Sequence, residues 1–265
     1  MTKNKMNFSG TFYPDEKNEL LKYFDYFKTS EEKIELDINP RAIIVPHAGY
    51  IYSGSVANIA YNLSKNINSK RIIVVGPSHR YYLDGASVCM FDFYETPLGD
   101  LPIDKEFASN LIKKYNWLNF DENAHMEHST ETQMPFIKNY FDKKVLEIVY
   151  GKIDFDELSL LISELLKDKD NFVVISTDLS HFHSLEEANI LDQNCIDAIR
   201  KQDINLLDEN CEACGIIGIM ALINASKKLN YKVEFLDYKT SYDVTKDDKS
   251  VVGYSSFILG EDIVI

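Results

Sequence analysis

Three histidines in this sequence each follow a short apolar segment by only a few residues. These segments are rich in β-branched residues and are typical of buried strands. Because the carboxyl ends of parallel strands meet at one edge of a sheet, we expect the three imidazoles to converge there. Imidazole either ligates a metal or transfers protons near neutral pH. A surface loop or a helix cap is the simpler interpretation of one such histidine, but three repeats of the placement favour a site. The histidines and their segments are His47 after Ile43–Val45, His79 after Ile72–Val75 and His181 after Phe172–Ile175.

Asp178 lies three residues before His181 in the run Ser176–His181. A carboxylate at this position can orient the imidazole or bind a metal itself. The alternative role of an aspartate directly after a strand is to cap the N-terminus of a helix. The sequence alone leaves both interpretations open.

The pair Cys211-x-x-Cys214 has the spacing of a redox motif or of half a zinc site. A zinc site needs a second pair of ligands, and the sequence holds no second Cys-x-x-Cys. A thioredoxin-like motif follows a strand early in its fold, whereas this one lies late in the chain. Cys214 directly precedes Gly215 and a long apolar helix, whose dipole favours a thiolate. Cys214 is therefore a candidate ligand or reactive thiol, with a small residue in a tight turn as the alternative. Cys89 and Cys195 lie in apolar patterns, and we expect both to be buried structural thiols.

A further pair of histidines lies in the polar segment 124–133. His125 and His128 are three residues apart, but only a helix places them side by side. Their spacing matches no zinc signature. We expect Ser129 or Thr130 to cap the helix that follows. A solvated helix start is the simpler interpretation of His125.

The elements that must position these residues alternate between short strands and longer helices. In 156–166 the apolar residues fall on one face of a helix. Strands separated by helices at this spacing predict one α/β domain over residues 1–265, with a mostly parallel or mixed sheet covered by helices on both faces. The predicted strands are Ala42–Val45, Ile72–Val75, Ala86–Phe91, Val145–Val149, Phe172–Ile175 and Val251–Leu259. The predicted helices are Asp15–Phe27, Ser55–Lys65, Lys105–Tyr115, Phe155–Leu166, Leu185–Lys201 and Ile216–Leu229.

The composition excludes several classes of function. The chain has 265 residues and a formal net charge of −14, whereas a nucleic-acid or anionic-membrane partner requires clustered Lys and Arg. No apolar run approaches the ~20 residues that span a bilayer, and the polar start is unlike a signal peptide, so we expect a cytoplasmic protein. Four cysteines are too few for a disulfide framework in a chain of this length. The sequence also holds no phosphate-binding glycine loop and no Gly-x-Ser-x-Gly elbow.

Several of these residues lie in motifs that resemble the Memo family, whose microbial members are also called AmmeMemoRadiSam system protein B. The motifs follow the family's order and spacing from near residue 8 to near residue 258. They are Gly10–Pro14, Pro46–Gly54, Gly76–His79, Thr96–Gly99, Glu127–Ser129 with Gln133 and Pro135, Ser176–His181 and Cys214–Gly215. The family's fold is similar to that of the class III extradiol ring-cleaving dioxygenases, an α/β architecture with a metal site at one sheet edge.

The resemblance implies a role for each residue that matches a motif. His47, His79 and Cys214 take the positions of metal ligands. His181 matches the acid–base position of the dioxygenases, and Asp178 lines the same pocket. The further cleft candidates are His128, Glu131, Tyr52 and Ser53.

The expected chemistry departs from that of the dioxygenases at one ligand. Those enzymes bind iron(II) with two histidines and a carboxylate, whereas the family pattern places Cys214 in the carboxylate's position. A thiolate is softer, binds copper or zinc well and can itself be oxidised. We therefore expect iron(II) or copper in preference to zinc, and metal-dependent redox chemistry. Ring cleavage does not follow from the fold.

Two other classes of function fit the same residues. A binding or scaffold protein would use the cleft for a peptide or small-molecule ligand, and the microbial family name points to radical-SAM and Ammecr-type partner proteins. A metal-assisted hydrolase would activate a zinc-bound water, but it makes little use of an oxidisable Cys214. We expect no nucleic-acid partner and no membrane partner.

Overall fold

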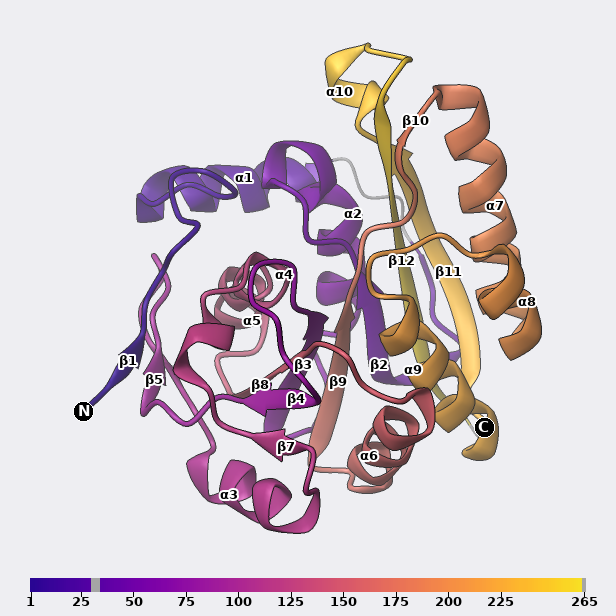
Figure 1. The fold of residues 1–265 in the computed structure, drawn as a ribbon. Helices are drawn as coiled ribbons and strands as arrows, with labels where there is room; N and C mark the ends of the chain where they lie inside the picture. The colour runs from indigo at the N-terminus through magenta and orange to yellow at the C-terminus, as the bar shows by residue number, and fades with distance from the viewer. Residues whose placement is uncertain (30–33, 264–265) are drawn as a thin grey trace.

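A mixed β-sheet runs through the centre of the computed structural model, which describes residues 1–29 and 34–263 (Figure 1). Four parallel strands, β2, β9, β3 and β8, form its middle, and the antiparallel strands β12 and β4 flank them. The strands in spatial order are β10 (His181–His183), β12 (Val251–Asp262), β2 (Ile38–Val45), β9 (Asn171–Ser176), β3 (Arg71–Pro77), β8 (Lys144–Tyr150), β4 (Ala86–Val88) and β7 (Leu118–Asn119), with β11 (Lys232–Thr240) paired to β12.

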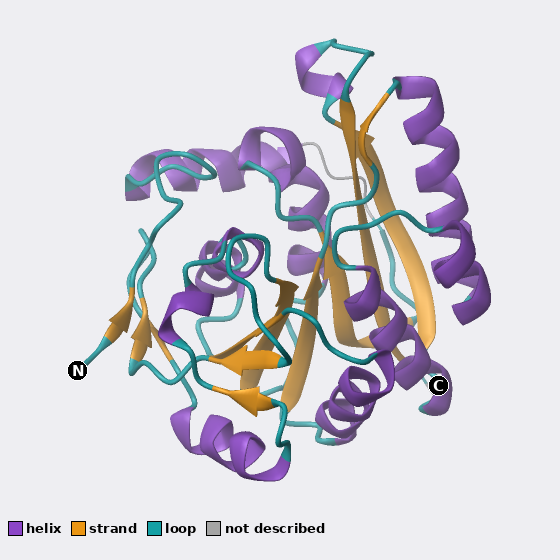
Figure 2. Cartoon of the chain, viewed as in Figure 1, coloured by secondary structure: helices purple, strands orange, loops and turns teal. Residues whose placement is uncertain are grey.

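A second, small sheet joins the N-terminus to the middle of the chain at the edge of the molecule, and helices flank the central sheet (Figure 2). The small sheet consists of β1 (Lys3–Asn4), β5 (Phe93–Tyr94) and β6 (Leu101–Pro102). The helices are α1 (Lys17–Thr29), α2 (Tyr50–Leu63), α3 (Lys105–Lys114), α4 (His128–Glu131), α5 (Met134–Tyr140), α6 (Phe155–Lys167), α7 (Leu185–Lys201), α8 (Ile204–Asn210), α9 (Ile216–Lys228) and α10 (Tyr242–Thr245), and a 3-10 turn spans Glu122–His125. None of the helices in the described part of the chain is both long and apolar enough to cross a membrane.

The central strands bury alternate residues on the two faces of the sheet, because successive side chains of a strand point in opposite directions. On one face, Ile43 and Val74 pack with α1, α2 and α5. On the other face, Ile44 and Val75 pack with α3, α6, α7 and α9. The predicted α/β class, with a mixed sheet covered on both faces, is therefore confirmed. The similarity to the dioxygenase fold stays a prediction.

The predicted elements agree with the structure in their interiors and differ at some ends. α7 has the predicted bounds, since Ser184 and Glu187 form a capping box at its start. α2 begins five residues before the predicted Ser55, at Tyr50, and the predicted strand Ala86–Phe91 ends as β4 at Val88. The sequence does not predict β11, because charged residues interrupt its apolar pattern and most of its side chains are only half-buried.

Candidate metal centre

Two parallel strands of the central sheet deliver two of the predicted ligands to its carboxyl edge. β9 lies between β2 and β3, so His47 follows one neighbour of β9 and His79 follows the other. The short helix α4 packs against the end of β3 at Gly76. A Cβ at Gly76 would lie 2.7 Å from Ser129 Oγ, so the glycine permits the close approach that brings α4 to the site.

His47 is the most enclosed of the histidines at this edge, with 2% of its surface exposed. Its backbone N–H donates to Asp178 Oδ1 (2.8 Å), and its Nδ1 lies 3.0 Å from Ser176 Oγ. The other ring nitrogen, Nε2, lies 3.4 Å from Cys214 Sγ and 3.9 Å from Asp178 Oδ2. Burial lowers the pKa of His47 to about 4, although the Asp178 carboxylate acts in the opposite direction. The ring is therefore neutral at pH 7, the state in which imidazole ligates metals.

One buried carboxylate, that of Glu127, contacts two more imidazoles. Glu127 Oε1 lies 3.0 Å from His79 Nδ1 in an aligned hydrogen bond, and 2.8 Å from His128 Nδ1 without that alignment. Burial by itself would raise the pKa of Glu127, but its contacts with His128 and His79 hold the pKa well below its usual range. Glu127 also caps α4 by accepting the Ser129 N–H. The prediction that Ser129 or Thr130 caps this helix is therefore wrong.

His47, His79 and His128 form one cluster. Their candidate ligand atoms all lie within 4.8 Å of one another. The ring centroid of His47 lies 5.2 Å from that of His79 and 5.3 Å from that of His128. Because each Nδ1 faces an oxygen of Ser176 or Glu127, Nε2 is the nitrogen that is left to bind a ligand. The structure thus brings His47 and His79 together as predicted, with His128 as the third imidazole where the strand-end argument expects His181.

His181 lies outside this cluster, in β10, which β12 separates from β2. Its half-buried imidazole packs on the Phe182 ring, with centroids 5.6 Å apart. The acid–base role of His181 stays a prediction. Asp178 contacts the backbone of His47, and the next helix along the chain begins only at Leu185. The alternative of Asp178 as a helix cap is therefore wrong.

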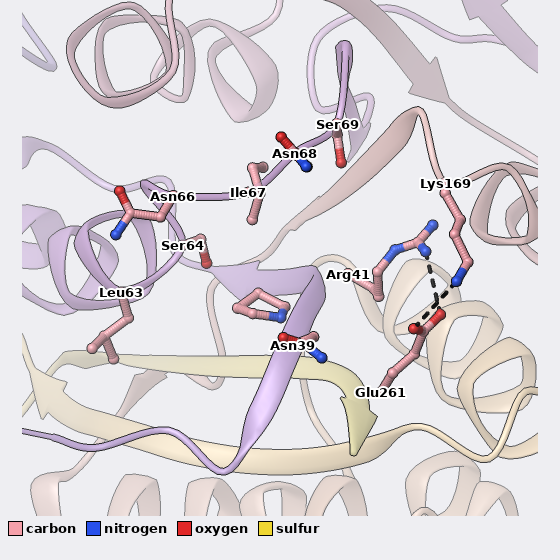
Figure 3. Close-up of a pocket in the computed structure, with 11 residues that line it drawn as sticks. Asn39, Arg41, Leu63, Ser64, Asn66, Ile67, Asn68, Ser69, Lys169 and Glu261 are labelled. Atoms are coloured by element: carbon pink, nitrogen blue, oxygen red, sulfur yellow. Dashed lines mark hydrogen bonds and ion pairs between the residues drawn. The ribbon is translucent and has the colours of Figure 1, made fainter. Parts of the chain in front are cut away.

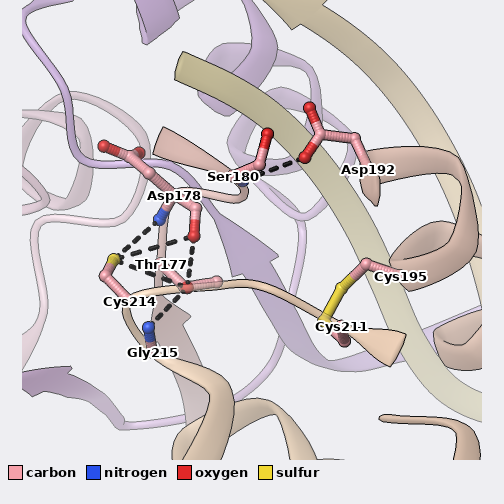
Figure 4. The surroundings of a disulfide bond; sticks show 8 residues. All are labelled: Thr177, Asp178, Ser180, Asp192, Cys195, Cys211, Cys214 and Gly215. Carbon is pink, nitrogen blue, oxygen red and sulfur yellow. Dashed lines mark hydrogen bonds between the residues drawn. A yellow bond between two sulfur atoms is a disulfide. The ribbon is translucent and has the colours of Figure 1, made fainter. Parts of the chain in front are cut away.

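Cys214 lies against the segment that follows β9 (Figure 4). Its backbone N–H donates to the Asp178 carbonyl (3.3 Å), and the Asp178 N–H donates to its sulfur (3.2 Å). Gly215 permits this approach, because a Cβ there would lie 2.7 Å from Thr177 Cβ. Burial raises the pKa of the Cys214 thiol to about 12, and the Asp178 carboxylate adds to the effect. Burial thus opposes the thiolate that the start of α9 is expected to favour, and the ligand role of Cys214 stays a prediction.

Cys211, the other member of the Cys-x-x-Cys pair, forms a disulfide with Cys195 of α7. Cys195 is buried as predicted, but the prediction of a structural thiol there is wrong, because its sulfur is bonded. Cys89 is a free and buried thiol, which confirms its prediction. Since Cys211 is bonded to Cys195, Cys211 and Cys214 do not act as one redox or zinc-binding pair.

The N-terminal segment packs over His128. The rings of Phe8 and Phe12 lie 5.6 and 4.9 Å from the His128 ring, measured between centroids. Glu131 fixes this segment by accepting the Phe8 backbone N–H (2.7 Å) and the Tyr13 hydroxyl (2.8 Å). Of the cleft candidates, Glu131 therefore holds the N-terminal segment that covers the cluster.

Two further cleft candidates lie in the first turn of α2. Ser53 is buried, and its hydroxyl donates to the Ala48 carbonyl (3.0 Å), just before the start of the helix. Tyr52 is 37% exposed. A binding role for either side chain stays a prediction.

A second group of possible ligands is completely buried. Cys89, His125 and Glu147 place their ligand atoms within 4.8 Å of one another. However, His125 Nδ1 lies 2.7 Å from Glu147 Oε2, and His125 Nε2 lies 2.8 Å from Ser87 Oγ. Both ring nitrogens are thus engaged by the protein itself, so this group is a structural polar network. The expectation of a solvated helix start at His125 is wrong.

A cavity of about 500 Å³ lies at the opposite edge of the sheet (Figure 3). Arg41 lines it from the beginning of β2, whereas His47 follows the end of the same strand. Arg41 Nη2 donates to the carbonyls of Leu166 and Asp168 (both 2.9 Å), and its Nη1 lies 3.4 Å from Glu261. Arg41 therefore stabilises the end of α6, and the cavity is separate from the histidine cluster.

The fold and the cluster together define an α/β protein with a histidine-rich site at the carboxyl ends of its central strands. A family model described as "Memo-like protein" matches residues 4–258. The chain is 36% identical to a MEMO1 family protein of Methanococcus maripaludis strain C5, over 95% of this chain and 97% of that protein. It is 36% identical to one of Aquifex aeolicus (94% and 96% covered) and 38% identical to one of Methanobrevibacter smithii (94% and 97%). The chain therefore belongs to the Memo family.

Proposed function

We propose that this protein binds one iron or copper ion at the histidine cluster and uses it for redox chemistry on a small substrate. The observation that carries the proposal is the convergence of three imidazoles whose ligand atoms lie within 4.8 Å of one another. His47, His79 and Cys214 are the proposed ligands, as the family resemblance implies. His128 is a further donor within reach of both histidines.

The donor set fits such an ion by its chemistry. Imidazole and thiolate ligands suit copper and iron, and burial keeps His47 neutral. Ser176 contacts Nδ1 of His47, and Glu127 contacts Nδ1 of His79. Such contacts orient a metal ligand and typically contribute about 10–100-fold to metal affinity. Because the pKa of Cys214 is about 12, its ionisation near pH 7 requires a cation beside the sulfur. Ionisation of Cys214 is thus coupled to metal binding.

A bound iron or copper ion supplies electron-transfer chemistry that no side chain of the cluster provides by itself. The protein's own residues hold and orient the site and move protons. Glu127 fixes the His79 ring and backbone, and Asp178 fixes the His47 backbone. We propose His181 as the proton-transfer group, as the family resemblance implies, and its ring is half-buried.

The test is a metal titration of protein that is purified under reducing, chelator-free conditions. Metal content is measured by mass spectrometry, and affinity for iron(II), copper and zinc by competition with a chelator of known affinity. His79→Ala is expected to lower the affinity for iron or copper by about 100-fold or more, because it removes a ligand that wild type holds in place. Lys70→Ala is the control, since Lys70 is an exposed residue directly before β3, at the other end of the strand that His79 follows, and pairs with Asp170 (2.7 Å).

Cys214→Ser and His128→Gln extend the same titration to two of the other donors. Under the proposal, Cys214→Ser shifts affinity from copper toward harder ions, because a hydroxyl replaces a soft thiolate. Wild-type protein that takes up neither iron nor copper would contradict the proposal, as would unchanged affinity in His79→Ala. Uptake of zinc alone would contradict the redox part and favour metal-assisted hydrolysis.

A further inference from the structure

The disulfide between Cys195 and Cys211 fastens the segment 211–215 to α7 (Figure 4). Cys195 is fully buried in α7, and Cys211 is half-buried directly after α8. Cys214 follows three residues later, with its sulfur 3.4 Å from His47 Nε2. The disulfide therefore fixes the segment from which Cys214 reaches the histidine cluster.

One turn of α7 holds two segments of the chain at once. Asp192 and Cys195 are three residues apart and lie on the same side of the helix. Asp192 Oδ1 accepts the Ser180 N–H (2.9 Å), so α7 holds the segment that follows β9. Cys195 holds Cys211 through the disulfide, so α7 also holds the segment that precedes α9. Loss of the disulfide removes the covalent link between α7 and the segment that precedes α9.

Glu212 connects the same two segments from the other direction. Its carboxylate accepts the His181 N–H (3.2 Å) and lies 2.9 Å from His183 Nε2. Between these histidines, Phe182 has a φ of +63°, a left-handed backbone that is costly for a residue with a side chain. This backbone therefore depends on contacts such as those of Glu212. Because Glu212 adjoins Cys211, release of the disulfide also loosens the contact that supports His181.

We propose that Cys195–Cys211 is a reversible redox site, and that its reduction by a dithiol loosens segment 211–215 and uncovers Cys214. The attacking thiolate bonds to the sulfur of half-buried Cys211, the S–S bond breaks, and Cys195 takes the electron pair and a proton. The second thiol of the reductant then attacks the mixed disulfide. The reductant leaves as a disulfide and Cys211 as a thiol, so two electrons and two protons pass to the protein.

The contacts that remain after reduction are non-covalent. Hydrogen bonds with the Asp178 backbone hold Cys214 (3.3 and 3.2 Å), one with Thr177 Oγ1 holds Gly215 (2.9 Å), and Glu212 keeps its contacts with the segment 181–183. Local opening requires only that such contacts break together, which costs less than global unfolding. We therefore expect the Cys214 thiol to be alkylated about tenfold faster in the reduced protein than in the oxidised protein.

The test compares alkylation of the full-length protein before and after reduction, with the reductant removed under anaerobic conditions before labelling. Peptide mass spectrometry measures the labelling rate of each cysteine. Cys89 is the internal control, because it is a free, fully buried thiol in a different part of the sheet. Under the proposal, labelling of Cys214 accelerates about tenfold while that of Cys89 does not change. Hydrogen exchange is expected to rise in 178–183 and 211–215 only.

Cys211→Ala reproduces the reduced state without a reductant, and Cys89→Ala is the matched cysteine control. The first is expected to accelerate labelling of Cys214 in air, and the second to leave it unchanged. Equal rates in oxidised and reduced protein would overturn the proposal. Cys195 and Cys211 recovered as free thiols from air-exposed protein would also overturn it, as would a parallel rise in Cys89 labelling, since opening would then be global. None of these readouts requires a bound metal.

Discussion

Glu127 contacts two of the three histidines of the cluster. Its two oxygens contact the ring of His79, the backbone of His79 and the ring of His128. A carboxylate in this position fixes the tautomer and the orientation of an imidazole and raises its basicity as a ligand. The low pKa of Glu127 keeps this carboxylate charged, so the orientation persists across the physiological pH range.

Glu127→Gln is expected to lower the metal affinity of the cluster by about 10–100-fold, because a neutral amide orients the two rings less well. The measurement is a competition titration against a chelator. Glu187→Gln serves as the control, since Glu187 likewise lies at a helix start and takes part in a capping box. An equal loss in both variants would show only a general effect of weakening a helix start, and no loss in Glu127→Gln would show that Glu127 does not orient the ligands.

At the scale of elements, α4 is the most dependent on its surroundings. A helix of four residues has no stability by itself, so tertiary contacts must hold it. Ser129 Oγ donates to the Pro77 carbonyl at the end of β3 (2.8 Å), and Thr130 donates to Glu147 of β8. Glu131 fastens the N-terminal segment to the same helix. The position of His128 thus depends on three separate parts of the chain.

The Glu131 anchor predicts a pH dependence of stability. Burial raises the pKa of Glu131 from 4.5 to about 6, in spite of the hydrogen bonds from Phe8, Asn7 and Tyr13. Between these values the folded chain binds more protons than the unfolded chain, so stability falls as pH rises. Glu131 contributes about 2 kcal/mol to the free energy of unfolding. This contribution is fully present below about pH 4.5 and lost above about pH 6.

Glu131→Gln removes this titration. In urea unfolding, the stability of the variant relative to wild type is expected to improve by about 2 kcal/mol between about pH 4 and about pH 7.5. The wild-type protein at each pH is the control, so titrations shared by both chains cancel. A stability difference that does not change with pH would show that Glu131 titrates as it does in the unfolded chain.

The elements that the sequence predicts well are those with a strong local pattern. The β-branched runs of β2, β3 and β9 locate His47 and His79, because these strands are adjacent and parallel. α4 is too short to show periodicity, so the position of His128 and the role of Glu127 depend on contacts that no local pattern encodes. Glu127 precedes His128 directly and Ser176 ends β9, which are the only signals for these two residues. The Cys195–Cys211 bond likewise requires the packing of α7 beside the segment after α8.

For the whole molecule, the candidate site exists only in the folded chain. His47 and Cys214 are 167 residues apart in sequence but have their side chains in contact. The remaining donors come from the end of β3 and from α4. An unfolded chain cannot present these donors together, so a metal that binds here binds the native state selectively. Binding and folding must then be linked.

This linkage can be predicted quantitatively. At a free metal concentration of about 100 times Kd, the native state gains about 2.7 kcal/mol. For a chain of this size that gain raises Tm by roughly 5–10 °C. The measurement is thermal unfolding of the wild-type protein over a series of iron(II) or copper(I) concentrations under anaerobic conditions, with Kd obtained independently by titration. His79→Ala is expected to lose most of the shift, and a chelator to reverse it in the wild type. An equal rise in Tm in wild type and His79→Ala would place the bound metal elsewhere. A rise in Tm that follows the independently measured Kd ties the stability of the whole fold to occupancy of this cluster.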